Sequence, residues 1–213
     1  MDENIQWVNK EKILRTIKAL DNNNMNGYYV KDKDELINKI EEIVKEDSIV
    51  SVGGSQTLFE TGVIDYLRTN RYKFLDRYEE GLSREEIVKI FKKTFSADAY
   101  FTSSNAITED GFLYNVDGNG NRVAAMLYGP EKVIVICGVN KIVKDLDRAI
   151  DRNRQVSAPS NAKRLNRNTP CTKVGYCMDC KSSERICNEY TLIKRQGNKD
   201  RIHVIFLDEE FGY

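Results

Sequence analysis

Apolar residues recur along the chain with two different spacings. Over residues 36–44 and 142–150, and more loosely over 87–95, they follow the i, i+1, i+4, i+7, i+8 pattern of one helix face. Shorter apolar runs are typical of strands: SIVSVGG, YKFLDRY, AYFTSS, KVIVICGV and HVIFLD. Because such strands alternate with helices, the sequence predicts an α/β fold with a mainly parallel sheet covered on both faces.

The domain organisation is simple. The 213 residues contain no internal repeat and no low-complexity linker, and their number does not require two domains. We expect residues 1–24 to form an N-terminal helical extension that ends in an Asn-rich turn. Residues 25–213 are then one domain, which includes a cysteine-rich segment at 169–188. Ser83 followed by Glu86 is a capping box that predicts the start of a helix.

The charge of the chain is balanced, with 33 Lys and Arg residues against 33 Asp and Glu residues. The chain as a whole therefore has no net positive charge that would attract nucleic acid or an anionic membrane. No run reaches the roughly 18 apolar residues of a membrane helix, and the charged N-terminal stretch is unlike a signal peptide. We expect a cytoplasmic protein that binds neither nucleic acid nor membrane. Residues 141–167 carry eight Lys and Arg against three Asp, which indicates either a solvated helix face or a positive rim beside a pocket.

The stretch GGSQT at residues 53–57 lies between an apolar strand at 49–52 and a helix that we expect over residues 57–69. Glycines permit close backbone approach, and the N–H groups at a helix N-terminus attract anions. One interpretation is a tight turn with Ser or Thr as N-cap. We favour the other, a loop that binds an anion or substrate. Its candidate residues are Gly53, Gly54, Ser55 and Thr57.

Polar residues crowd the stretch TSSNAITEDGFLYNVDGNGNR at 102–122. A β-hairpin would explain its two Asp-Gly pairs. Loops at the carboxyl ends of parallel strands are where α/β proteins bind ligands, so we expect a small-molecule pocket here. The candidate ligand-binding residues are Asn105, Gly118, Asn119 and Asn121. With a single histidine in the chain, the catalytic candidates are carboxylates, chiefly Glu109 and Asp117.

Four of the five cysteines lie within 17 residues, with the spacing C-x5-C-x2-C-x6-C. Without a secretory signal, this clustering favours metal or redox chemistry over disulfides. Four thiolates suit structural zinc or a [4Fe–4S] cluster, and the spacing does not choose between them. Reduced thiols or a disulfide are the alternative. The predicted metal ligands are Cys171, Cys177, Cys180 and Cys187, whereas Cys137 is expected in the core.

Three stretches together resemble the LUD-domain family of lactate-utilisation proteins. They are VSVGGSQTLFETG, TSSNAITEDGFLYNVDGNGNRVAAMLYGPEKVIVICGVNKIV and RAIDRNRQVSAPSNAKRLNRNTPCTKVGYCMDCKSSERICN, and the resemblance covers about residues 10–213. It implies a Rossmann-like sheet similar to that of ribose-5-phosphate isomerase, glucosamine-phosphate deaminase and CoA transferases. In those relatives the loop that matches residues 53–57 contacts a phosphate or the CoA region. Glu109-Asp110-Gly111 resembles the Glu-x-Gly context of the CoA-transferase glutamate.

The resemblance implies a role in lactate or related organic-acid redox metabolism. The expected ligand is a small anion, either a carboxylate, a phosphate or a CoA-like group, and the cysteines would hold an iron–sulfur cluster or zinc. Candidate partners are iron–sulfur or oxidoreductase proteins and a second copy of the chain. Two alternatives stay open. One is a stand-alone transferase or isomerase that uses Glu109 or Asp117 with structural zinc, and the other is a non-catalytic ligand-binding subunit.

Overall fold

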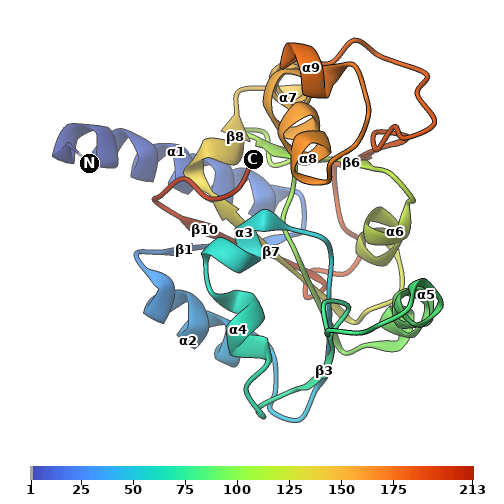
Figure 1. Ribbon diagram of the computed structural model, residues 1–213. Coiled ribbons are helices and arrows are strands. Elements are labelled where there is room, and N and C mark those ends of the chain that lie inside the picture. Colours follow the sequence, from blue (N-terminus) through green and yellow to red (C-terminus); the bar gives the residue numbers. More distant parts are fainter. Residues whose placement is uncertain (1) are drawn as a thin grey trace.

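Six parallel strands form the central sheet in the order β1-β10-β7-β4-β2-β3. The structure is a computed structural model that describes residues 2–213 (Figure 1). The strands are β1 (Asn26–Val30), β2 (Ile49–Val52), β3 (Lys73–Leu75), β4 (Ala99–Thr102), β7 (Lys132–Gly138) and β10 (Ile202–Leu207). Each of the five apolar runs supplies one of these strands, and the predicted parallel α/β sheet is confirmed. The sequence pattern did not predict β1.

A second, smaller sheet has the order β8-β5-β6-β9. Its strands are β5 (Ala106–Thr108), β6 (Leu113–Asp117), β8 (Ile142–Val143) and β9 (Glu189–Ile193). The first Asp-Gly pair, at 110–111, lies in the antiparallel hairpin between β5 and β6, as expected. The second pair, at 117–118, instead leads into helix α6 (Asn121–Leu127).

Helices cover the central sheet on both faces. They are α1 (Glu3–Asn22), α2 (Lys33–Ile43), α3 (Gln56–Glu60), α4 (Val63–Leu67), α5 (Arg84–Lys93), α6, α7 (Leu146–Arg152), α8 (Ala158–Arg164) and α9 (Cys171–Val174), with a π-helix at Asn153–Ser157. Helices α2, α3 and α4 bury Leu36, Leu58 and Ile64 against one face, whereas α1 and the second sheet pack on the other (Figure 1). A parallel sheet needs this double cover because its strands are apolar on both sides.

Three local predictions meet different outcomes. The capping box is confirmed, because Ser83 Oγ accepts from the Glu86 N–H and the Glu86 carboxylate accepts from the Ser83 N–H. The helix expected from residue 57 to residue 69 is interrupted at Gly62, whose φ of 76° is left-handed. The helix expected from Ile142 begins only at Leu146, because the preceding two apolar residues pair with β5 as strand β8.

The predicted N-terminal helix is α1, and its second half is part of the core. Its side chains Ile13 and Leu20 are fully buried among residues of both sheets, while its first half projects beyond the body (Figure 1). The helix passes very close to the β5–β6 turn, where a Cβ added to Gly111 would lie 2.7 Å from the backbone of Ala19. No helix within residues 2–213 is long and apolar enough to span a bilayer.

Candidate functional site

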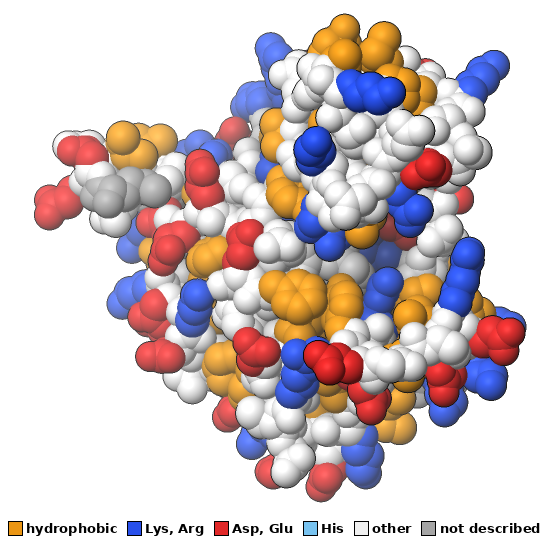
Figure 2. Space-filling view, viewed as in Figure 1, with side chains coloured by type: hydrophobic (Ala, Val, Ile, Leu, Met, Phe, Trp, Pro, Cys, Tyr) orange, Lys and Arg blue, Asp and Glu red, His pale blue; other side chains and the backbone are white. Residues whose placement is uncertain are grey.

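A polar cavity of about 300 Å³ opens at the carboxyl edge of the central sheet. The loops after β2 and β4, the end of β6, the turn after β7 and helix α8 line it. Figure 2 shows the hollow between the part of the molecule that carries α7–α9 and the body below, with Lys and Arg side chains inside it and along its edges. The cavity therefore lies where an open parallel α/β sheet is expected to bind ligands.

The glycine loop supplies one wall of the cavity. Gly54 and Ser55 line it, and Ser55 is also the N-cap of α3, since its Oγ accepts from the Leu58 N–H at 3.4 Å. Gly53 and Thr57 lie behind this wall. A Cβ added to Gly53 would lie 2.8 Å from the Tyr100 hydroxyl, so this glycine is needed for packing. The turn and the cavity wall are thus made by the same residues.

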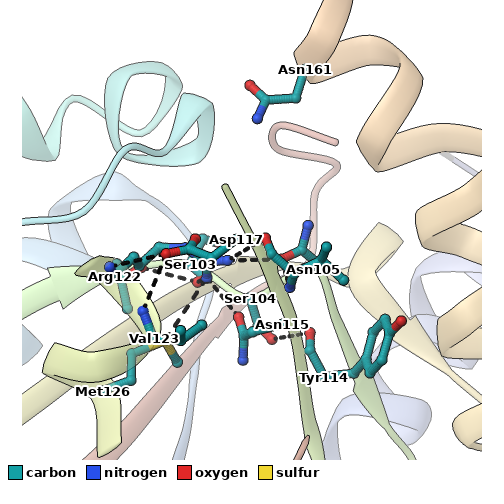
Figure 3. A network of polar contacts seen from close by, with 12 residues as sticks. Ser103, Ser104, Asn105, Tyr114, Asn115, Asp117, Arg122, Val123, Met126 and Asn161 are labelled. Atoms are coloured by element: carbon teal, nitrogen blue, oxygen red, sulfur yellow. Dashed lines mark hydrogen bonds and ion pairs between the residues drawn. The ribbon is translucent and has the colours of Figure 1, made fainter. Parts of the chain in front are cut away.

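A buried arginine, which packs beside Gly53, organises a network of polar contacts in the cavity wall (Figure 3). Arg122 is 8% exposed, and its Nε donates to Asp117 Oδ1 at 3.0 Å. Its other oxygen acceptors are the Asn115 and Asn105 side-chain oxygens, at 2.6 and 3.0 Å, and the carbonyls of Ser103 and Val116, at 3.2 and 3.0 Å. The guanidinium therefore ties the loop after β4 to strand β6.

The structure brings together most of the predicted pocket residues. Asn105, Asp117, Gly118, Asn119 and Asn121 all line the cavity. The second oxygen of Asp117 accepts from the backbone N–H groups that start α6, at 3.0 and 3.4 Å. Both carboxylate oxygens are thus engaged in holding the wall together.

Glu109, the other predicted catalytic carboxylate, is not among the residues that line the cavity. It lies at the β5–β6 turn and forms an ion pair with Arg15 of α1, with 3.3 Å between Oε2 and Nη2. The structure therefore does not bring the two predicted catalytic carboxylates to one site.

Sequence reasoning counted Lys141 among the cations of the segment 141–167 but did not single it out, although it is the most deeply buried cation of the cavity. This residue follows β7 and is 3% exposed, and its Nζ donates to Thr57 Oγ1 at 2.8 Å and to Ser103 Oγ at 3.0 Å. Burial lowers the pKa of Lys141 to about 8, and the charges of Arg152 and Arg122 act in the same direction. Its position just after a central strand, at the edge where the other loops meet, was the signal that could have identified it.

The basic segment at 141–167 divides between the two roles expected for it. Lys141, Arg164 and Arg167 line the cavity. Arg148 is a solvated residue of α7 that pairs with Asp151 at 3.4 Å. The positive rim is therefore present, but only part of the segment forms it.

The four clustered cysteines surround one small cavity beside the first. All are free thiols, and Ile186 lines both cavities. Burial raises the pKa of the Cys187 thiol, against the opposing effect of Arg185. Within residues 2–213, however, no three His, Cys, Asp or Glu side chains are arranged to hold a metal ion. Cys137 is fully buried in the core, as predicted.

Backbone contacts attach the cysteine segment to the wall of the polar cavity. The Asn188 N–H donates to the Asp117 carbonyl at 2.8 Å, and the Asn188 side chain donates to the Gly118 carbonyl at 2.9 Å. Ile186 packs so closely on Gly118 that an added Cβ there would lie 3.2 Å from its carbonyl oxygen. The cysteine segment and the polar cavity are therefore adjacent parts of one region.

The sheet order and the cavity at its carboxyl edge define a Rossmann-like α/β domain. The chain belongs to the LUD-domain family, whose model matches residues 13–207. This confirms the resemblance found in the sequence.

Among solved structures, the chain is similar to a DUF162 family protein from Deinococcus radiodurans. The two are 13% identical, with a TM-score of 0.54, and the match covers 93% of this chain and 98% of the other. At this identity the likeness shows the fold alone. eIF2B beta from Chaetomium thermophilum is 16% identical over 55% of this chain and 44% of its own, and its TM-score of 0.37 is too low to support any argument. No curated protein matches the chain.

Proposed function

We propose that the chain binds a small organic anion in the polar cavity and acts in lactate or related organic-acid redox metabolism. The observation that supports this most directly is the charge of the cavity. Its cationic lining residues are Arg77, Arg122, Lys141, Arg164 and Arg167. Asp117 is the one acidic side chain among the described lining residues, and Arg122 already neutralises it. A carboxylate or phosphate would offset the remaining positive charge.

The size of the cavity favours a small ligand. About 300 Å³ is at the lower end of ligand pockets, which suits a hydroxy acid, an oxo acid or a short phosphorylated metabolite. A CoA-like ligand would extend beyond it. Acid–base catalysis by a carboxylate has less support, because Glu109 lies outside the cavity and both Asp117 oxygens already accept hydrogen bonds.

The four cysteines are proposed to hold the metal centre of this protein. The type of ligand suits zinc or an iron–sulfur cluster, since four free thiols line one cavity. A backbone donor is also present, because the Asp179 N–H donates to Cys177 Sγ at 3.4 Å. The thiols would need to move closer together to bind an ion. An iron–sulfur cluster would supply electron transfer beside the anion pocket, whereas zinc would stabilise the loop.

Substitution of Gly54 tests the anion site. A Cβ at Gly54 would lie 3.6 Å from Arg77 Nη1, an ordinary contact, so Gly54→Val should fold normally while filling space in the cavity. We expect lactate or phosphate binding, measured by calorimetry, to weaken by at least about tenfold, or about 1.4 kcal/mol. Gly197→Val is the matched control, because nothing lies near Gly197. Equal affinities for the two variants would leave the loop as a turn only.

Elemental analysis after anaerobic purification tests the metal site. We expect about four irons per chain for one cluster, or about one zinc, with visible absorption only in the first case. The double variant Cys177→Ser with Cys180→Ser should lose this metal, because it removes half of the thiolates. Cys137→Ser should retain it, since Cys137 lies in the core. Wild-type protein without metal, or a double variant that keeps its full metal content, would refute the site.

A further inference from the structure

Lys141 is a buried amine at the inner wall of the polar cavity. Its hydrogen-bond partners are the neutral hydroxyls of Thr57 and Ser103. Buried lysines usually have a carboxylate partner. The carboxylate whose charge acts on Lys141 is Glu60, and Glu60 Oε2 already accepts from the Gly212 N–H at 2.6 Å. Lys141 is therefore held in place by groups that do not stabilise its charge as an ion pair would.

The surroundings of Lys141 lower its pKa and so raise the fraction of neutral amine, although most of it is still protonated at pH 7. Burial has the largest effect, the guanidiniums of Arg152 and Arg122 add to it, and Cys137 and Glu60 oppose it. With a pKa of about 8 in place of the ordinary 10.5, about a tenth of the amine is neutral at pH 7. This neutral fraction is about 300-fold larger than that of a lysine with the ordinary pKa. Desolvation and neighbouring cations are the features that activate lysine as a nucleophile.

We infer that Lys141 is a catalytic residue whose Nζ forms an imine with a carbonyl group of the bound organic anion. The ligand class is thereby narrowed to compounds with a carbonyl next to an anionic group, such as 2-oxo acids or aldehyde phosphates. The cavity arginines hold the anionic group, and Lys141 meets the carbonyl carbon. This inference rests on the proposed function, because it needs the cavity to bind an organic anion.

The reaction balances without any further reactant. The lone pair of the neutral amine adds to the carbonyl carbon, and the carbonyl oxygen takes up a proton to give a carbinolamine. That oxygen then leaves as water and carries away both amine hydrogens, so that a C=N bond replaces C=O. Ser103 Oγ, which lies 3.0 Å from Nζ and lines the cavity, is placed to relay a proton between nitrogen and oxygen.

Reductive trapping of the full chain tests the inference. Pyruvate or glycolaldehyde phosphate is added with cyanoborohydride, and the modified residue is located by peptide mass mapping. We expect one adduct per chain at Lys141, formed at pH 7 at least about tenfold faster than at the exposed Lys163. The rate of adduct formation at Lys141 should level off above about pH 8, because its amine is then already largely neutral.

Matched variants separate chemistry from folding. Lys141→Arg and Lys141→Met should both lose the adduct, with circular dichroism and thermal melting to show that each is folded, whereas Lys163→Arg should keep it. An adduct with only one probe identifies the anionic group as carboxylate or phosphate. Calorimetric binding of either probe, with no adduct at Lys141 from pyruvate or from glycolaldehyde phosphate, would overturn the inference and leave the proposed function intact. Absence of both binding and adduct, with lactate and phosphate also not bound, would overturn both.

Discussion

Replacement of Arg122 with methionine should lower the free energy of unfolding by about 3–5 kcal/mol, the usual cost of breaking a buried ion pair from one side. The substitution leaves the carboxylate of Asp117, which is 9% exposed, without its cation. It also removes the donor to the amide oxygens of Asn105 and Asn115. Urea denaturation followed by circular dichroism measures the change.

Two comparison variants make the prediction specific. Arg122→Lys restores the positive charge but not the planar set of N–H donors of the guanidinium. It should therefore recover only part of the lost free energy of unfolding. Arg164→Met removes another cavity cation, but that side chain is exposed and bonded to Asn161 of its own helix. It should therefore weaken anion binding with little effect on stability. A loss of less than about 1 kcal/mol for Arg122→Met would show that the buried network is not a structural unit.

Gly138→Ala is expected to be the second most damaging change. An added Cβ would lie 2.4 Å from the Glu209 carbonyl oxygen and 2.6 Å from the Phe211 nitrogen, so the segment at 209–212 would have to move. Overpacking of this kind costs about 1–3 kcal/mol. The same segment accepts a hydrogen bond from Thr57 Oγ1 through the Phe211 carbonyl. Its movement should admit water to Lys141 and return the pKa of that amine toward its ordinary value.

Thermal melting tests this prediction. For a chain of this size each kcal/mol corresponds to about 2–4 °C, so Gly138→Ala should melt roughly 2–12 °C below wild type. Gly197→Ala is the matched control, because its new Cβ would meet open space. Equal melting temperatures for both variants would show that the segment at 209–212 adapts at no cost.

The central sheet could be predicted because its inner strands are mostly apolar. β7 after Lys132, and β10 except for His203, are apolar runs, and exposing such runs to water is unfavourable, so they are expected in a core. The edge strand β1 and the half-buried β9 lack such a run, and their sequences NGYYV and EYTLI do not stand out. Ile142 and Val143 have apolar spacing that suits a helix or a strand, and pairing with β5 decided between them.

The lining of the cavity was predictable in its loops and in part of its positive rim, but the burial and pairing of its charged side chains were not. The residues around 54–55 and 117–121 were found because turn chemistry places polar groups at a sheet edge. The burial of Lys141 depends on Thr57, 84 positions away, and the position of Glu109 depends on Arg15, 94 positions away. Contacts between residues so far apart in the chain leave no periodic pattern in the sequence, so they cannot be predicted from any local stretch.

The strand order has a consequence for how the chain is made. β10 is the last strand in sequence, yet in the sheet it lies between β1 and β7, and β1 has no other neighbour there. During synthesis from the N-terminus, β1 and one edge of β7 must therefore wait unpaired until almost the whole domain has left the ribosome. Such long-range pairing is slow, and open strand edges are prone to aggregate. The nascent chain is thus most prone to aggregate just before residues 202–207 emerge. Insertion of β10 then pairs the open edges of β1 and β7 at the same time.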